Sequence, residues 1–299
     1  MEKHMRISLR RKKITGLDLA FRIIWFTVMT LLSLSYIYMY VWLLMNSFRK
    51  SSDFIINTFD LFDFKNFTIK NYETLFKTQI AGTARNPVYL KDTILTTCIL
   101  VVGQVALAVT IPSLTAYIIA KYEFKLKKLI YNVSIVSFII PSVGSIATTY
   151  KLMTKLGLLN TYLGMFVMAA GGFGLGFLLF KNFFAAIPWD YAESAFLDGA
   201  TDLGVFFRIM YPQALPILTA IAITAFIGCW NDYSTAYIFM NNRPTISLGV
   251  SQLYTKMERS LELPIAFAGM TVLATVSLLV FTIFNKMIMS NFSAGGLKG

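Results

Sequence analysis

Few side chains in this sequence could perform acid–base, nucleophilic or metal chemistry together. The chain of 299 residues has one histidine, His4, and two cysteines, Cys98 and Cys229, both in apolar stretches. We interpret these cysteines as small buried apolar residues. No Ser-His-acid set, paired-histidine metal motif or phosphate-binding loop can be assembled from this set. The sequence therefore predicts no catalytic site, no metal site and no cofactor bound by this chain alone.

The acidic residue Asp232 is the one carboxylate well inside an apolar stretch, in the run Trp230-Asn231-Asp232-Tyr233. An ionisable group within a membrane span is a functional candidate. With Asn231 it could line a polar pathway or support a gate. Alternatively, Asp232 lies near enough to the interface to be hydrated and only orients the helix end. The residues leave both interpretations open.

The most informative stretch, residues 187–216, predicts two short helices separated by a turn. Pro188 suits a first helical position, so a helix is expected over 189–197. It should end at Asp198-Gly199, because glycine favours the conformation that closes a helix. Thr201 is expected to cap a second helix. Such a compact knob suits docking into a groove of a soluble partner. The alternative is a loop that only covers the base of a helix bundle.

The composition indicates which elements position these residues. Only 14% of the residues are charged and mean hydropathy is +0.63, whereas a soluble domain has about 25% charged residues. A bilayer core about 30 Å thick needs roughly 20 apolar helical residues. Six segments meet that length, so we predict an all-α integral membrane protein with six transmembrane helices. The segments are 19–48, 93–120, 129–150, 156–180, 214–240 and 264–288.

The distribution of Lys and Arg predicts the orientation of these helices. With a cytoplasmic N-terminus, 15 basic residues lie inside and 12 outside, and seven of the outer ones lie in one long loop that counts for little. Both termini are therefore expected in the cytoplasm. The predicted parts are a tail at 1–18, a membrane domain at 19–290 and a tail at 291–299. Within the domain we expect outer loops at 49–92 and 241–263 and a cytoplasmic segment at 187–212, with ordered structure in the first loop.

Proline and glycine mark irregular places in the predicted spans. Pro112 and Pro141 permit kinks, which would reflect uneven packing or bound a translocation cavity. In the run 171–176, Gly172 and Gly176 lie one helical turn apart. This run lacks the strand–turn–helix context of a phosphate loop, so we expect it to serve close helix packing.

The knob stretch resembles the cytoplasmic loop of ABC importer permeases. That loop has Glu-Ala-Ala, three residues, Gly, nine residues and then Ile-x-Leu-Pro. The matching residues, at the same spacings, are Glu193-Ser194-Ala195, Gly199 and Ile209-Met210-Tyr211-Pro212. Ser194 replaces the central alanine and Tyr211 replaces leucine.

Two further stretches resemble a subgroup of that family. The run 230–233 is similar to the Trp-Asn-Asp/Glu-aromatic motif of maltose-permease-type carbohydrate permeases. The ending 293–299, with its small residues and final Lys-Gly, resembles the second permease subunit of such systems. The resemblance covers about residues 92–299.

The resemblance implies a multi-pass cell (plasma or inner) membrane protein that imports a sugar or oligosaccharide. Its implied partners are a second permease subunit, two ATPase subunits that bind ATP and Mg, an extracytoplasmic binding protein facing the loop 241–263, and the lipid bilayer. The C-terminal tail would also reach the ATPases. The residues implied to couple to the ATPase are Glu193, Ser194, Ala195, Asp198, Gly199, Ala200, Ile209 and Pro212, and Trp230, Asn231, Asp232 and Tyr233 are pathway or gate candidates.

Other classes of function compete with this interpretation. A secondary transporter or channel of six helices would leave the knob unexplained, and no inverted repeat is visible. A non-transporting scaffold could use the knob to recruit a partner. The net charge of +12 would suit nucleic-acid binding in a soluble protein, but here the basic residues are expected on cytoplasmic loops, so we expect no nucleic-acid partner.

Overall fold

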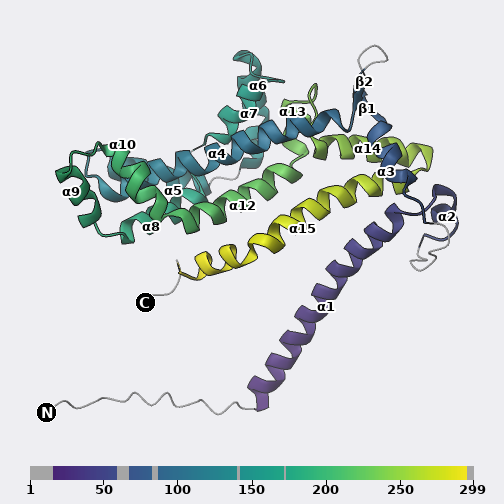
Figure 1. Cartoon of the computed structure of the whole chain (residues 1–299), viewed down its shortest axis with the longest axis horizontal. Helices are drawn as coiled ribbons and strands as arrows, with labels where there is room; N and C mark the ends of the chain where they lie inside the picture. Colours follow the sequence, from purple (N-terminus) through teal and green to yellow (C-terminus); the bar gives the residue numbers. More distant parts are fainter. Residues whose placement is uncertain (1–15, 59–66, 83–86, 140–141, 172, 295–299) are drawn as a thin grey trace.

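The computed structural model describes residues 16–58, 67–82, 87–139, 142–171 and 173–294. Within these ranges the chain is mostly helical (Figure 1). The predictions for His4, the tail 1–15, the run 59–66, Pro141, Gly172 and the ending 295–299 fall outside the described residues. The elements are α1 Gly16–Ser47, α2 Ser51–Ile56, α3 Lys70–Lys77, β1 Gln79–Gly82, β2 Pro87–Tyr89, α4 Asp92–Lys121, α5 Lys127–Ile139, a 3-10 turn Ser142–Ser145, α6 Ile146–Lys155, α7 Tyr162–Ala169, α8 Leu175–Ala186, α9 Asp190–Leu197, α10 Asp202–Val205, a π-helical turn Phe206–Met210, α11 Tyr211–Gln213, α12 Leu215–Asn231, α13 Ser234–Phe239, α14 Ile246–Ser260 and α15 Leu263–Ala294.

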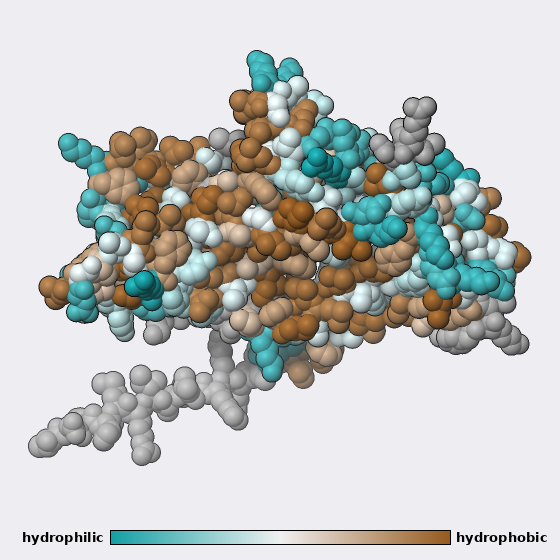
Figure 2. Space-filling model, turned by 45° about the horizontal axis from the view of Figure 1, so that its top comes forward, coloured by the Kyte–Doolittle hydropathy of each residue, from teal (hydrophilic) through white to brown (hydrophobic). Residues whose placement is uncertain are grey.

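Three helices of the described chain are long and apolar enough to cross a membrane: α1, α4 and residues Leu263–Met287 of α15. Each exceeds the roughly 20 residues that a bilayer core requires. Figure 2 shows a largely hydrophobic surface across the middle of the molecule, with hydrophilic residues gathered toward its ends. This arrangement is that of a membrane protein, as the composition predicts.

The other predicted spans are not single helices. Residues 129–150 divide into α5, the 3-10 turn and α6, and residues 156–180 divide into α7 and α8. The prediction of continuous helices there was wrong because it rested on the length of the apolar stretch, which does not reveal breaks in the helix. Gly174, directly before α8, has a positive φ of 158°. In contrast, α4 continues through Pro112, which is buried.

The predicted span 214–240 also breaks. It contains α12 and α13, and the break falls at Asp232. Before α12, the segment Asp202–Gln213 lies at 80° to Leu215–Asn231. The chain therefore turns sharply where the knob joins this helix.

The helices run alternately between the two ends of the molecule. In Figure 1, α1 and α12 run toward the end that carries α2, α3, the two strands and α14, whereas α4 and α15 run away from it. We call the first of these the α14 end and the opposite one the α9 end. The described chain starts in α1 and finishes in α15, and both points lie away from the α14 end.

The predicted outer loop 49–92 is ordered in its described parts. Arg49 is only 2% exposed, and its guanidinium donates to the carbonyls of Asn57 at 2.7 Å and Asp53 at 3.0 Å. The Asn71 amide donates to the carbonyls of Ser47 and Arg49, both at 2.7 Å. These bonds join α2 and α3 to the end of α1, because buried polar groups require partners.

A short antiparallel pair, β1 and β2, departs from the all-α prediction. Gln79 pairs with Tyr89 and Gly82 with Pro87, with an irregularity after Gln79. Gly249 in α14 lets this hairpin approach, since a Cβ there would lie 2.7 Å from the Ile80 side chain.

Two buried clusters define the two ends. At the α14 end, residues including Leu75, Leu90, Leu253 and Ile265 pack together. At the α9 end, the large rings of Phe180, Phe184 and Phe206 form the centre of a larger core. A Cβ at Gly176 would lie 3.7 Å from the Ile221 side chain, an ordinary contact distance, so the predicted close packing does not require a glycine at this position.

Candidate functional site

Helix α9 and the turn after it form the tip of the knob, which we define as residues 187–212. Trp189 precedes the helix, and Glu193 lies in its first turn with Asp190. Acidic residues there suit the positive end of the helix dipole. Pro188 lies two residues before the first helical residue, so the predicted start at 189 was one residue early.

The break predicted at Asp198-Gly199 is present, and its hydrogen bonds explain it. The amide of Ala200 donates to the Ala195 carbonyl at 2.9 Å, and that of Gly199 to the Phe196 carbonyl at 3.0 Å. This pair of bonds is the Schellman motif, which needs a left-handed residue at its centre. Gly199 supplies it with a φ of +83°.

The return from the tip begins with a side-chain cap. The Thr201 hydroxyl accepts from the Gly204 amide at 3.2 Å, as expected for the start of α10. Pro212 lies in the first positions of α11, and Pro216 in those of α12. Both prolines thus begin helices, where their missing amide hydrogen does no harm.

Aromatic rings hold the knob on the ends of α4 and α8. Phe206 is fully buried and lies 5.1 Å from Tyr117 and 6.2 Å from Phe184, measured between ring centroids. Trp189 meets Tyr122 edge to face at 5.8 Å. The Lys121 ammonium donates to the Ile187 carbonyl. Movement of the knob would therefore be transmitted to α4 and α8 rather than absorbed in a loose loop.

Tyr122 and Asp202 form the polar link between α4 and α10. The tyrosine hydroxyl donates to the carboxylate at 2.7 Å. Burial and this hydrogen bond raise the pKa of Tyr122 above its usual value. The hydroxyl therefore keeps its proton and remains a donor over the physiological pH range.

The predicted coupling residues divide between the two faces of the knob. Glu193, Ser194, Asp198, Gly199 and Pro212 are exposed, and Ala200 and Ile209 are half-buried. Ala195 is only 8% exposed, so it allows α9 to pack closely on the core instead of forming part of the outward surface.

Sequence reasoning missed the apolar residues that the knob exposes. Leu197 is 89% exposed, and Tyr191, Leu203 and Phe207 are also exposed. Exposed large apolar groups next to acidic residues are typical of protein–protein contacts. The available signal was an apolar residue, Leu197, two positions before the glycine that ends the helix.

The run Trp230-Asn231-Asp232-Tyr233 lies at the break between α12 and α13. One Asp232 carboxylate oxygen accepts from the Ser234 hydroxyl at 3.1 Å and the Thr235 amide at 3.0 Å. The carboxylate thus caps α13, and the interpretation that it orients a helix end accounts for these bonds.

The neighbours of Asp232 tie α12 to α15. The Trp230 indole donates to the Leu273 carbonyl at 3.2 Å, and the Asn231 amide to the Ser277 hydroxyl at 2.9 Å. Asn231 and Tyr233 are exposed, so both remain candidates for a polar pathway.

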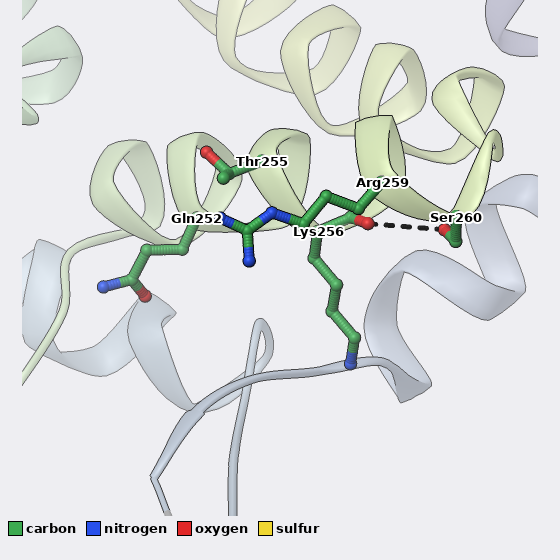
Figure 3. A pocket seen from close by; sticks show the side chains of 5 residues that line it. All are labelled: Gln252, Thr255, Lys256, Arg259 and Ser260. Carbon is green, nitrogen blue, oxygen red and sulfur yellow. Dashed lines mark hydrogen bonds between the residues drawn. The ribbon is translucent and has the colours of Figure 1, made fainter.

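A polar hollow of about 390 Å³ lies at the α14 end, lined by Gln252, Thr255, Lys256, Arg259 and Ser260. Figure 3 shows the Arg259 side chain reaching along α14 toward Gln252, and Lys256 pointing away from the helix. The Lys256 ammonium donates to the Gln79 carbonyl at 3.0 Å. Within the described ranges Arg259 has no hydrogen-bond or ion-pair partner. The hollow therefore offers a free cation to an anionic group.

No three His, Cys, Asp or Glu side chains lie close enough to hold a metal ion in the part of the chain that the structure describes.

Comparisons with known proteins agree on the class of this chain. The profile of the family described as "Binding-protein-dependent transport system inner membrane component" matches residues 90–293. The diacetylchitobiose uptake system permease protein NgcG of Streptomyces coelicolor is 28% identical, over 86% of this chain and 83% of its own length. The melibiose/raffinose/stachyose import permease protein MelC of Bacillus subtilis is 30% identical, over 70% of this chain and 77% of its own.

Two further comparisons cover nearly the whole chain. The trehalose/maltose transport system permease protein MalG of Thermococcus litoralis is 26% identical, over 90% of this chain and 94% of its own. The crystal structure of a bacterial ABC transporter that imports the acidic polysaccharide alginate contains a chain of similar fold. Its TM-score is 0.73 at 16% identity, over 91% of this chain and 98% of that one.

Proposed function

The chain belongs to the family of binding-protein-dependent transport system inner membrane components, and from this premise we propose that it is one of two transmembrane subunits of an ABC importer for a sugar or oligosaccharide. The knob on α9 and α10 is the observation that carries the proposal, because lipid contact alone gives no reason for such a structure. A six-helix channel or carrier would leave it without a partner.

The proposed topology has six spans and cytoplasmic termini. Helices α1, α4, α12 and α15 make four spans, and the pairs α5–α6 and α7–α8 make two broken ones. Backbone breaks at membrane depth occur where they face protein or a water-filled cavity. The excess of Lys and Arg supports placing the α9 end in the cytoplasm.

The knob docks on a separate ATPase subunit that binds ATP and Mg. Leu197, at the tip, inserts into an apolar groove of that subunit, and Glu193 and Asp198 meet basic residues at its rim. Closure of two ATPase subunits would then push the knob against the ends of α4 and α8. The rigid ring contacts of Phe206 and Tyr117 support transmission of this movement.

The α14 end faces an extracytoplasmic binding protein that delivers the solute. The free Arg259 guanidinium and the polar hollow beside it support a contact with carboxylates on that protein.

A second permease completes the pathway. The exposed apolar surface of α1 is available for contact with this second permease and with lipid. Asn231 and Tyr233 are the best candidates in this chain for contact with the solute. The names of NgcG, MelC and MalG support the sugar class.

The test is co-expression of this chain with the genes that neighbour its own, followed by purification through a tag on this chain. We expect an ATPase and a second permease to co-purify. Their ATPase activity and the uptake into vesicles should rise when sugar-loaded binding protein is added. Leu197→Asp should reduce ATPase recovery at least tenfold, because a carboxylate would enter an apolar groove.

The matched control is Leu126→Asp, at an exposed position near the α9 end but outside the knob. It should leave ATPase recovery unchanged. A chain that purifies without an ATPase and still moves solute would establish the carrier or channel instead. An ATPase complex that is indifferent to Leu197→Asp would refute the docking assignment.

A further inference from the structure

A pocket between α4 and α10 has no assigned role in the importer. Its volume is about 260 Å³, and its lining is almost wholly apolar, from Leu114, Tyr117, Ile118, Tyr122, Leu203 and Phe206. Small-molecule sites usually measure about 300–1,000 Å³. This pocket therefore has room for part of a chain-like apolar ligand and not for a whole sugar.

The position of the pocket indicates where such a ligand comes from. Tyr117 and Tyr122 lie at the end of α4, next to Trp189, and rings of this kind favour the membrane interface. The side chains that flank the pocket, Ile118 and Leu203, are 40% and 60% exposed. The apolar lining thus continues onto the lipid-facing surface of α4, so an acyl chain can enter from the bilayer.

The polar groups of the pocket specify the head of the ligand. Asp202 lines the pocket, and one of its carboxylate oxygens accepts from Tyr122, which leaves the other as an acceptor. Asp202 forms no ion pair with any Lys or Arg side chain of the described residues. The buried Tyr117 hydroxyl lies beside that of Tyr122, so the free carboxylate oxygen of Asp202 is the acceptor that the pocket offers to a ligand.

We propose that this pocket binds an ethanolamine phospholipid of the inner leaflet, with its primary ammonium on Asp202 and one acyl chain between α4 and α10. A carboxylate at the mouth repels anionic headgroups. A primary ammonium donates three hydrogen bonds, whereas a choline headgroup carries the same charge and donates none.

The lipid would bridge the bilayer and the knob. Asp202 and Leu203 come shortly after the turn at Gly199, so the bound chain supports the side of α10 that faces α4. The inference depends on the membrane position of the α9 end and not on the ATPase or the solute. The experiments can therefore distinguish a failure of the lipid-binding proposal from a failure of the proposed transport function.

The experiment uses the full chain, with any subunits that co-purify, in phosphatidylcholine nanodiscs. A trace of phosphatidylethanolamine with a photoactivatable acyl chain is added, and adducts are mapped by mass spectrometry. We expect adducts on Leu114, Ile118 and Leu203. Unlabelled phosphatidylethanolamine should compete about tenfold better than added phosphatidylcholine, a ratio that corresponds to about 1.4 kcal/mol. This comparison needs no variant.

Two variants sharpen the result. Asp202→Asn should bring the two lipids within about twofold, and Leu203→Trp should fill the pocket and abolish the adducts. Leu126→Trp, a change of the same size at another exposed site, should retain them. Equal competition by the two lipids in the unaltered protein would mean ordinary annular lipid and would overturn the proposal. Adducts that survive Leu203→Trp, or that disappear whenever the ATPase is bound, would overturn it as well.

Discussion

Gly199 holds a backbone conformation that few other residues tolerate. Its φ is +83° and no atom lies within 4 Å of the place where a Cβ would be, so the restriction comes from the backbone alone. The turn that it closes sets the direction of α10 relative to α9. The shape of the knob thus depends on a residue with no side chain.

We expect Gly199→Ala to destabilise the purified chain by about 1–2 kcal/mol, the usual difference for a left-handed residue with a Cβ. Gly199→Asn should be milder, since asparagine adopts this region more readily. The measurement is thermal unfolding in detergent. Gly228→Ala is the matched control, because Gly228 also has open space but lies within helix α12. Equal effects at both positions would contradict the assignment of strain to Gly199.

Tyr122 makes the free energy of unfolding depend on pH in the alkaline range. Burial first, and the bond to Asp202 second, raise the pKa of Tyr122 in the folded chain, whereas an unfolded tyrosine ionises near pH 10. Above about pH 10 the unfolded state therefore loses a proton that the folded state keeps, and the free energy of unfolding falls as pH rises.

Tyr122→Phe should flatten this fall above about pH 10 and leave the pH profile at neutral pH unchanged in slope. Unfolding midpoints between pH 8 and 11 would measure it. Tyr191→Phe, at an exposed position on α9, is the control and should retain the slope of the unaltered chain. A Tyr122→Phe profile that parallels the original would refute the role of this hydroxyl.

Among the elements, α4 supplies the anchor for α14 as well as for the knob. The Thr97 hydroxyl accepts from the Ile246 amide at 2.8 Å, where α14 begins, and donates to the Thr93 carbonyl at 2.7 Å. Thr97 is 1% exposed. One buried hydroxyl therefore satisfies the start of a helix that lies 149 residues away in sequence.

Thr97→Val keeps the shape of the side chain and removes the acceptor. We expect a loss of about 1–3 kcal/mol, the penalty for a buried amide left unpaired. Thr93→Val is the control, because the Thr93 hydroxyl donates to the Leu90 carbonyl and caps no other helix. Thermal unfolding of the two variants would compare them, and a smaller effect for Thr97→Val than for Thr93→Val would contradict the capping role.

Elements differed in how well the sequence predicted them. The local rules of capping and glycine closure sufficed for α9 and α10, because each bond there joins residues within a few positions. The prediction failed for residues 129–180, because it used hydropathy, which measures the length of an apolar stretch and does not show whether the helix is continuous. The strand pair β1–β2 was missed because its strands, of four and three residues, are too short to show a pattern in the sequence.

The candidate site was predicted in the same uneven way. The residues of the knob could be named because they repeat a family spacing. The exposed Leu197 and the hollow beside Arg259 could not, because exposure depends on which face of a helix the core covers. The partners of Asp232 explain why its two interpretations stayed open: a cap and a pathway residue look alike in a sequence.

At the scale of the whole molecule, two surfaces at opposite ends differ in local charge. The knob exposes four acidic residues, Asp190, Glu193, Asp198 and Asp202, and one basic residue, Arg208, whereas the hollow on α14 carries Lys256 and Arg259 without a lining acid. We therefore expect partners of opposite charge character at the knob and at the hollow.

Arg259→Glu should weaken stimulation of the ATPase by the binding protein about tenfold and reverse its salt dependence, because attraction becomes repulsion. Titration of the binding protein at several salt concentrations would measure this. Lys155→Glu makes the same kind of charge change on α6, outside the hollow, and should have little effect. Similar losses for both variants would point to general electrostatic attraction rather than to this site.

The packing of α1 on α15 has a consequence for synthesis. The Tyr40 hydroxyl meets that of Thr275 at 2.8 Å, across 235 residues, and Trp42 packs on Phe267. Helix α1 thus leaves the ribosome more than 200 residues before the helix that it packs on. At about 5–20 residues per second, α1 waits in the membrane on the order of tens of seconds, and a chain truncated before α15 would leave it without this contact.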